Sequence, residues 1–144
     1  VAEKGYLNLE IRAHGEGGHS SMPPREMATT RLAQALVTLN DPQFVEAARY
    51  LAQQLLAAND GDARKLIDQL ALRVLGRSLS QREQAIVWAS WKDLRSHYGA
   101  QIEDAKALIQ VGESEPDPQL NPVDLAAWTL VCNQLLNLDE VLNK

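Results

Sequence analysis

The sequence predicts a mainly α fold, an irregular bundle of five or six helices preceded by one β-strand and a glycine-rich loop. Apolar residues recur every three or four residues along most of the chain, as they do on the buried face of a helix. Strict alternation of apolar and polar residues, which is typical of a half-buried strand, runs only from Tyr6 to Ala13. Prolines, glycines and capping residues divide the rest of the chain into segments of helical length.

The N-terminal strand is expected to lead into a loop. Residues 15–24 contain glycines that permit positive φ angles, and Pro23 and Pro24 exclude a continuing strand. No later segment has the pattern of a second strand, so the strand from Tyr6 to Ala13 would leave unpaired backbone groups on its edges. We therefore expect either a partner strand from another chain, as in a homodimer formed through this strand edge, or a segment separated from its native sheet.

Three helices are predicted in the first half of the bundle. The two prolines can open a first helix over residues 25–39. Asp41 as N-cap and Pro42 at the first helical position predict a second helix with one apolar stripe. A third helix, which is expected to stop at Gly76, repeats this pattern with Leu66, Ile67, Leu70, Ala71, Val74 and Leu75.

Three more helices are predicted in the second half. Ser80 and Glu83 have the spacing of a capping box and predict a fourth helix, which a short helix over residues 102–109 follows. Residues 112–120 contain two prolines and an acidic cluster, so they are expected to form an extended, solvated loop. Asn121 and Pro122 would then begin the last helix. Its expected inward-facing residues are Leu125, Trp128, Val131, Cys132, Leu135 and Leu136.

Length and composition predict one folded domain. The 144 residues are 45% hydrophobic and 23% charged, close to a soluble globular protein. We expect a single domain over residues 1–144, with strand and loop in 1–24 and the helical bundle in 25–144. The net charge of -5 and the scattered basic residues argue against a nucleic-acid partner, and no apolar run reaches the ~20 residues of a membrane span. Because the first residue is Val1, we expect a piece of a longer chain.

The residues that could carry chemistry are few and scattered. Cys132, the single cysteine, lies in an apolar helical run and is expected to be a buried thiol. Zinc hydrolysis needs several His and carboxylate ligands and a base, whereas the chain has only His14, His19 and His97. His97 is predicted at a helix end, where capping of the terminal carbonyls is expected. We therefore predict no catalytic residue, no metal ligand and no cofactor in the isolated chain.

Three further features each have a functional and a structural interpretation. The glycine-rich residues 15–21 could cradle an anion, but a flexible connection is favoured because no phosphate-loop spacing follows. The carboxylates of residues 113–117 could bind calcium, but a solvated loop is favoured because the glycine-centred calcium loop is missing. Trp88, Trp91 and Trp128 could line a ligand site or a partner groove, and we expect at least two of them in the core.

The string Gly-Gly-His-Ser-Ser-Met-Pro at residues 17–23 resembles the start of the lid, or dimerisation, domain of zinc carboxypeptidase and aminoacylase metallopeptidases. The resemblance covers about residues 1–36. It implies that His19 reaches across a dimer into the partner's active site, where it would bind the substrate carbonyl and stabilise the oxyanion. It also implies substrate binding by Gly17, Gly18, His19 and Ser20. That family's metal ligands lie in a separate catalytic domain, and its lid continues through strands that this sequence does not supply.

A second resemblance covers about residues 34–144. Segments at residues 34–49, 111–114, 125–131 and 135–140 are similar to a planctomycete surface-type domain of unknown function that accompanies cytochrome-like modules. The resemblance implies the C-terminal helical part of a larger exported or cell-surface protein with no established reaction. Its haem would lie in another module, because this chain has no Cys-x-x-Cys-His site. The two resemblances meet inside the helix predicted over residues 25–39, so we interpret the chain as a hybrid.

These observations lead to three functional hypotheses. The first is a non-catalytic helical interaction or structural module with a protein partner and no cofactor. The second is a lid segment that supplies His19 to a zinc-dependent amide hydrolase whose active site is completed elsewhere. The third is a stable scaffold without a ligand.

Overall fold

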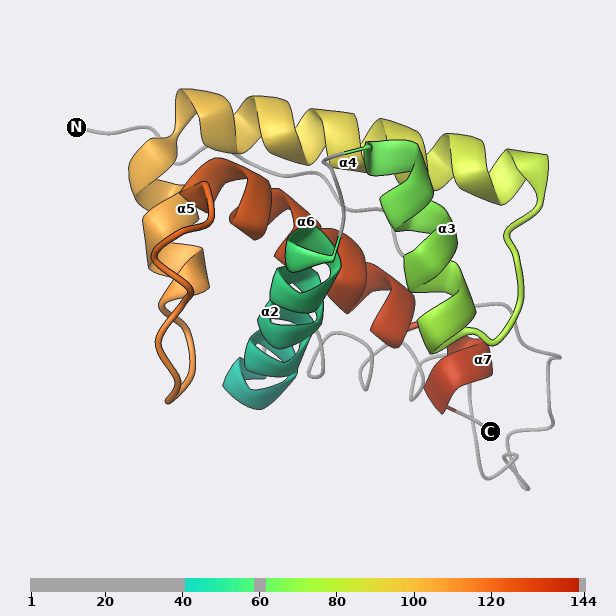
Figure 1. Ribbon diagram of the computed structural model, residues 1–144, viewed down its shortest axis with the longest axis horizontal. Helices are drawn as coiled ribbons and strands as arrows, with labels where there is room; N and C mark the ends of the chain where they lie inside the picture. Colours follow the sequence, from blue (N-terminus) through green and yellow to red (C-terminus); the bar gives the residue numbers. More distant parts are fainter. Residues whose placement is uncertain (1–40, 59–61, 143–144) are drawn as a thin grey trace, which may run out of the picture. The chain divides into compact units, whose positions relative to one another are not determined.

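The computed structural model describes residues 41–58 and 62–142, which lie in one compact unit, Thr38–Lys144. The strand expected from Tyr6 to Ala13, the glycine-rich loop and the helix expected over residues 25–39 lie outside the described residues. Helices account for most of what is described and confirm the mainly α class (Figure 1). In chain order they are α2 (Pro42–Ala57), α3 (Ala63–Val74), α4 (Gln81–Ala100), α5 (Ile102–Ile109), α6 (Pro122–Leu136) and α7 (Asp139–Leu142).

Side-chain caps begin three of these helices where the sequence predicts them. Ser80 and Glu83 form the expected capping box at α4. The Ser80 hydroxyl accepts from the Glu83 N–H at 3.3 Å, and the Glu83 carboxylate accepts from the Ser80 N–H at 2.7 Å. Asp41 caps α2 and Asn121 caps α6, each accepting a backbone N–H at 2.9 Å. Local sequence therefore determines where these helices start.

Helix α3 is the third predicted helix. Its first residue is Ala63, because the Asp62 carboxylate accepts the Arg64 N–H at 3.0 Å and the Lys65 N–H at 3.5 Å. Ala63 is buried and lies three residues before Leu66, so the apolar stripe extends into the first turn. The predicted stop is confirmed, since Gly76 follows the helix with a φ of 73°.

Helix α6 is buried on all sides. Among its residues only Asp124 is charged. It packs against α2, α4 and α5 and touches α3 and α7, and in Figure 1 it runs beneath α4 with α2 in front of it. Each large apolar side chain that it buries contributes roughly 1.5–3 kcal/mol. Its buried residues are Leu125, Ala126, Ala127, Trp128, Thr129, Val131, Cys132, Asn133 and Leu135.

The polar groups inside α6 are compatible with this burial. The Thr129 hydroxyl donates to the Leu125 carbonyl at 2.7 Å, which satisfies it within the helix. Cys132 is a free, buried cysteine, as predicted, and burial raises the pKa of its thiol well above the usual range. Within the described residues, no helix combines the length and apolarity that a membrane crossing requires.

A buried arginine ties the segment after α5 to α2. The Arg49 side chain is 2% exposed, and its guanidinium donates to the Ser114 carbonyl at 2.7 Å and to the Ser114 hydroxyl at 2.8 Å. It also donates to the Ile109 carbonyl at the end of α5. A buried charge is tolerated only when its donors are satisfied, so these contacts fix the course of the chain after α5.

Glu46 completes this cluster one turn before Arg49. Its carboxylate accepts the N–H of Ser114 at 2.7 Å and the N–H of Glu113 at 3.0 Å, and it also accepts the Ser114 hydroxyl. These hydrogen bonds lower the pKa of Glu46 to about 2. The bond from the Ser114 hydroxyl contributes most, and the two backbone N–H donors follow. Glu113, Ser114 and Glu115 are all exposed, as expected of a solvated loop, and the Glu46 carboxylate fixes the backbone at Glu113 and Ser114. We call Glu46, Arg49 and Ser114 the Arg49 clamp.

Gly112 should not tolerate a side chain. Its φ of 105° is strained for any other residue, and a Cβ there would overlap the Glu46 carboxylate. We expect Gly112→Ala to lower the free energy of unfolding by about 1–3 kcal/mol, measured by urea denaturation. Gly99→Ala is the matched control, because nothing lies within 4 Å of that position in α4. Gly99→Ala should leave the free energy of unfolding unchanged or raise it by up to about 1 kcal/mol. If both variants lost the same free energy of unfolding, the contact between Gly112 and Glu46 would not be the cause.

The Arg49 clamp also predicts a pH dependence. Because the folded-state pKa of Glu46 is about 2, below the ordinary 4.5, its stabilisation is complete above about pH 5. That stabilisation is lost as the pH falls through 4.5 towards 2. Glu46→Gln should therefore be less stable than the original chain at pH 7, and the difference should shrink as the pH is lowered in urea titrations. Glu115→Gln, which removes an exposed carboxylate from the same loop, should show no such shrinking difference.

Candidate functional site

The candidate site is a groove between α3 and α4, which encloses about 510 Å³. This volume lies within the range of small-molecule sites in proteins, about 300–1,000 Å³. We call it the α3–α4 groove. Helix α3 contributes Arg64, Ile67 and Asp68, and helix α4 contributes Gln81, Gln84, Ala85 and Trp88.

Helical periodicity explains why these residues meet. Positions 64, 67 and 68 share one face of α3, and positions 81, 84, 85 and 88 share one face of α4, because side chains three or four residues apart lie above one another. Ile67 is 3% exposed and belongs to the core, so it supplies the floor of the groove. The polar side chains of both helices stand around this apolar floor.

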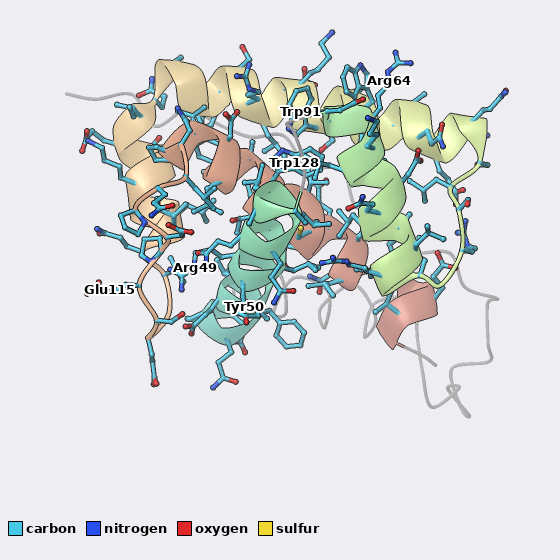
Figure 2. All side chains as sticks on the ribbon, in the orientation of Figure 1. Arg49, Tyr50, Arg64, Trp91, Glu115 and Trp128 are labelled. Atoms are coloured by element: carbon cyan, nitrogen blue, oxygen red, sulfur yellow. The ribbon has the colours of Figure 1, made fainter. Side chains whose placement is uncertain are left out.

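A chain of aromatic contacts connects the groove to the core. Trp88 lies 5.0 Å from Trp91 between ring centroids, and Trp91 lies 5.8 Å from Trp128. Trp128 is only 2% exposed, whereas Trp88 and Trp91 are half-buried and pack against the core. In Figure 2, Trp91 and Trp128 follow one another from α4 towards α6. The Trp88 ring is therefore held from behind and remains accessible at the groove.

Arg64 covers the Trp88 ring. Its guanidinium carbon lies 5.2 Å from the ring centroid, a cation–π arrangement at an exposed position. Figure 2 shows Arg64 at the end of α3 that is nearest α4. The guanidinium has no hydrogen-bond acceptor or carboxylate partner within residues 41–58 and 62–142. Its five N–H donors are therefore available to a ligand.

Asp68 and Gln84 join the two walls of the groove. The Gln84 side-chain amide donates to Asp68 Oδ1 at 3.0 Å. This bond leaves Asp68 Oδ2 and Gln84 Oε1 without a hydrogen bond in the part of the chain that the structure describes. The groove therefore presents two free acceptors beside the free guanidinium.

An ion-pair network fixes the start of α4, where the groove begins. Arg77 donates to Glu83 at 2.9 Å and to Glu140 at 2.7 Å. The hydrogen bond from Arg77, ahead of those from Ser80, lowers the pKa of Glu83 to about 2. All three side chains are about 40% exposed, so these ion pairs add little to the free energy of unfolding. Their main effect is to hold residue 77, the first turn of α4 and residue 140 next to one another.

A second arginine and tryptophan pair lies outside the groove. Arg95 lies 5.8 Å from the centroid of the Trp91 ring. Unlike Arg64, it has a carboxylate partner, because its Nε donates to Asp124 at 2.6 Å. Of these two arginines, only Arg95 is engaged by a carboxylate within the described residues.

The residues that the sequence singled out fall into two groups. His14 and the loop residues Gly17, Gly18, His19 and Ser20 lie outside the described residues, so their predicted roles stay predictions. His97 is described, but the side-chain capping expected of it is not found there. Its ring instead meets Tyr98 edge-on at 5.1 Å.

The structure also describes the acidic residues and the tryptophans that the sequence analysis considered. Among the described residues, no three His, Cys, Asp or Glu side chains converge as a metal site requires. Of the three tryptophans, Trp128 is in the core, and Trp88 and Trp91 are half-buried against the core.

The sequence did not predict the α3–α4 groove. The available signal was Trp88 on the same helical face as Gln81 and Gln84, but its opposite wall depends on how two helices pack.

Comparison with known proteins gives one match. The family described as PSD1: Protein of unknown function (DUF1553) matches residues 9–91. This range includes α2, α3 and the first half of α4, and therefore all seven groove residues. No curated protein and no solved structure matches the chain.

Trp88 and Trp128 should differ in their contribution to stability. Trp128→Ala removes a fully buried indole and should cost about 3–5 kcal/mol in urea unfolding. Trp88→Ala should cost clearly less, about 1–2 kcal/mol, because one side of its ring borders the groove. Equal losses would mean that Trp88 is a core residue and not part of a surface site.

Proposed function

The chain belongs to the PSD1 family of proteins of unknown function (DUF1553), and we propose that it is a non-catalytic helical interaction module of a larger, exported protein. The α3–α4 groove is its binding surface. We also propose that residues 1–144 form a single domain.

The observation that carries this proposal is the pairing of Trp88 with Arg64. A half-buried indole lies over an apolar floor beside an arginine that has no carboxylate partner among residues 41–58 and 62–142. Tryptophan and arginine are the residues that most often dominate binding energy at protein surfaces. Because Trp88 is backed by Trp91, a ligand would meet a surface that is already ordered.

The chemistry of the groove's own groups supports binding over catalysis. The Arg64 guanidinium offers only N–H donors, and Asp68 is engaged by Gln84. Outside the groove, the lowered pKa values of Glu46 and Glu83, about 2 each, keep both carboxylates ionised and make them weak general bases. The Cys132 thiol is buried, and its raised pKa keeps it protonated.

The resemblance at residues 17–23 supports a different assignment, a lid that donates His19 to a zinc-dependent amide hydrolase. In that case Gly17, Gly18, His19 and Ser20 would bind substrate, and the strand from Tyr6 to Ala13 would form the homodimer. A scaffold without a ligand is the remaining alternative. The hydrolase and the interaction module differ in a measurable way, because only the hydrolase needs His19 for turnover.

Photocrosslinking tests the interaction module. A benzoylphenylalanine in place of Gln84 should give covalent adducts when the full-length parent protein is irradiated in its native cells. The same residue in place of Ala89, which is exposed elsewhere on α4, should not. Equal adduct yields at both positions, or none at position 84, would contradict the proposal. So would hydrolysis of N-acetyl-amino acids or dipeptides by the zinc-supplemented chain, if His19→Ala abolished it.

A further inference from the structure

We propose that the α3–α4 groove binds a neutral carbohydrate, with one or two sugar rings seated beside Trp88. This inference rests on the proposed function and names the ligand class of the same groove. The dimensions agree with it. The α4 wall runs from Gln81 to Trp88, which at 1.5 Å per residue is about 10 Å, and the groove encloses about 510 Å³.

The polar lining consists of planar groups. Arg64, Asp68, Gln81 and Gln84 carry a guanidinium, a carboxylate and two carboxamides. Each has two polar atoms side by side, so each can engage two neighbouring hydroxyls at once. Sugar hydroxyls both donate and accept, and they occur in adjacent pairs around the ring. The free N–H donors of Arg64 and the free acceptors Asp68 Oδ2 and Gln84 Oε1 are complementary to such a pair.

The charge of the groove favours a neutral ligand. Arg64 contributes one positive charge and Asp68 one negative charge, so the formal charges of the seven lining residues cancel. An anionic ligand would meet the carboxylate, and a cationic ligand would meet the guanidinium. A polyol can hydrogen-bond to both without an unpaired charge of its own.

Trp88 supplies the apolar face that a sugar ring needs. One side of its ring is held against Trp91, and the Arg64 guanidinium lies over it at 5.2 Å. Arg64 is exposed, so a sugar can take its place over the indole and pack its C–H face there. The displaced guanidinium then donates to the hydroxyls at the rim of the same ring.

The lining fits a peptide less well. A helical peptide requires a continuous apolar groove, whereas only Ile67, Ala85 and Trp88 of the seven lining residues are apolar. An extended peptide pairs with an open sheet edge, and both walls of this groove are helices. The short, mixed lining is suited to a compact polar ligand with one apolar face.

Nuclear magnetic resonance of the three indole N–H groups tests the inference on the full chain of 144 residues. Single Trp→Phe variants assign the signals, and the probes are maltotriose, cellotriose, xylotriose and laminaritriose. With at least one of them, the Trp88 signal should shift saturably, and the Trp128 signal should shift least because that ring is buried. No shift with any probe, or a Trp128 shift as large as that of Trp88, would overturn the inference.

Conservative variants separate specific binding from a general effect. Asp68→Asn and Gln84→Ala should each weaken the affinity roughly three- to tenfold, since each removes one or two hydrogen bonds. Asp93→Asn, an exposed carboxylate of α4 outside the groove, should leave it unchanged, and an equal loss there would overturn the assignment. If photocrosslinking gave protein adducts at position 84 but no trisaccharide shifted the Trp88 signal, the carbohydrate proposal would be wrong and the proposal of an interaction module would remain. The absence of both responses would overturn both proposals.

Discussion

The all-round burial of α6 is the constraint on which the rest of this structure depends. A helix with one charged residue and nine buried ones can expose little of its surface to water, so other helices must cover it. Helices α2, α4 and α5 do so, and the short α7 follows directly after it. The Arg49 clamp also helps to cover α6. It holds the connection between α5 and α6 against α2 and thereby fixes where α6 begins.

The groove is a consequence of the same packing. Trp128 extends from α6 towards α4, where it meets Trp91, and Trp91 in turn supports Trp88 at the surface. The capping box at Ser80 and the ion pairs of Arg77 fix the first turn of α4. The α4 wall of the groove is thus held in place by contacts outside the groove. Such separation lets the binding surface keep exposed polar groups while the core supplies the stability.

The sequence predicted the local features of the fold well, because these depend on neighbouring residues. Asp41, Ser80 and Asn121 mark the starts of three helices, because each of these side chains accepts a backbone N–H only two or three residues further along the chain. The start of α3 was not predicted, although Asp62 caps it by the same chemistry and the apolar stripe begins directly after it at Ala63. The Arg49 clamp was missed because its partners lie 60 to 68 positions away, and no local pattern reports such a contact. For the same reason the groove could not be predicted, since Arg64 and Trp88 meet only once α3 and α4 have packed.

The central claim is that Trp88 and the polar groups around it form a carbohydrate site on a preorganised helical pair. A crystal structure of the chain soaked with the most responsive trisaccharide tests it most directly. The account predicts a sugar ring packed on Trp88, with its hydroxyls hydrogen-bonded to Arg64, Asp68 or Gln84 and with α3 and α4 unmoved. A trisaccharide bound elsewhere on the chain, or a groove that stays empty under saturating ligand, would contradict it.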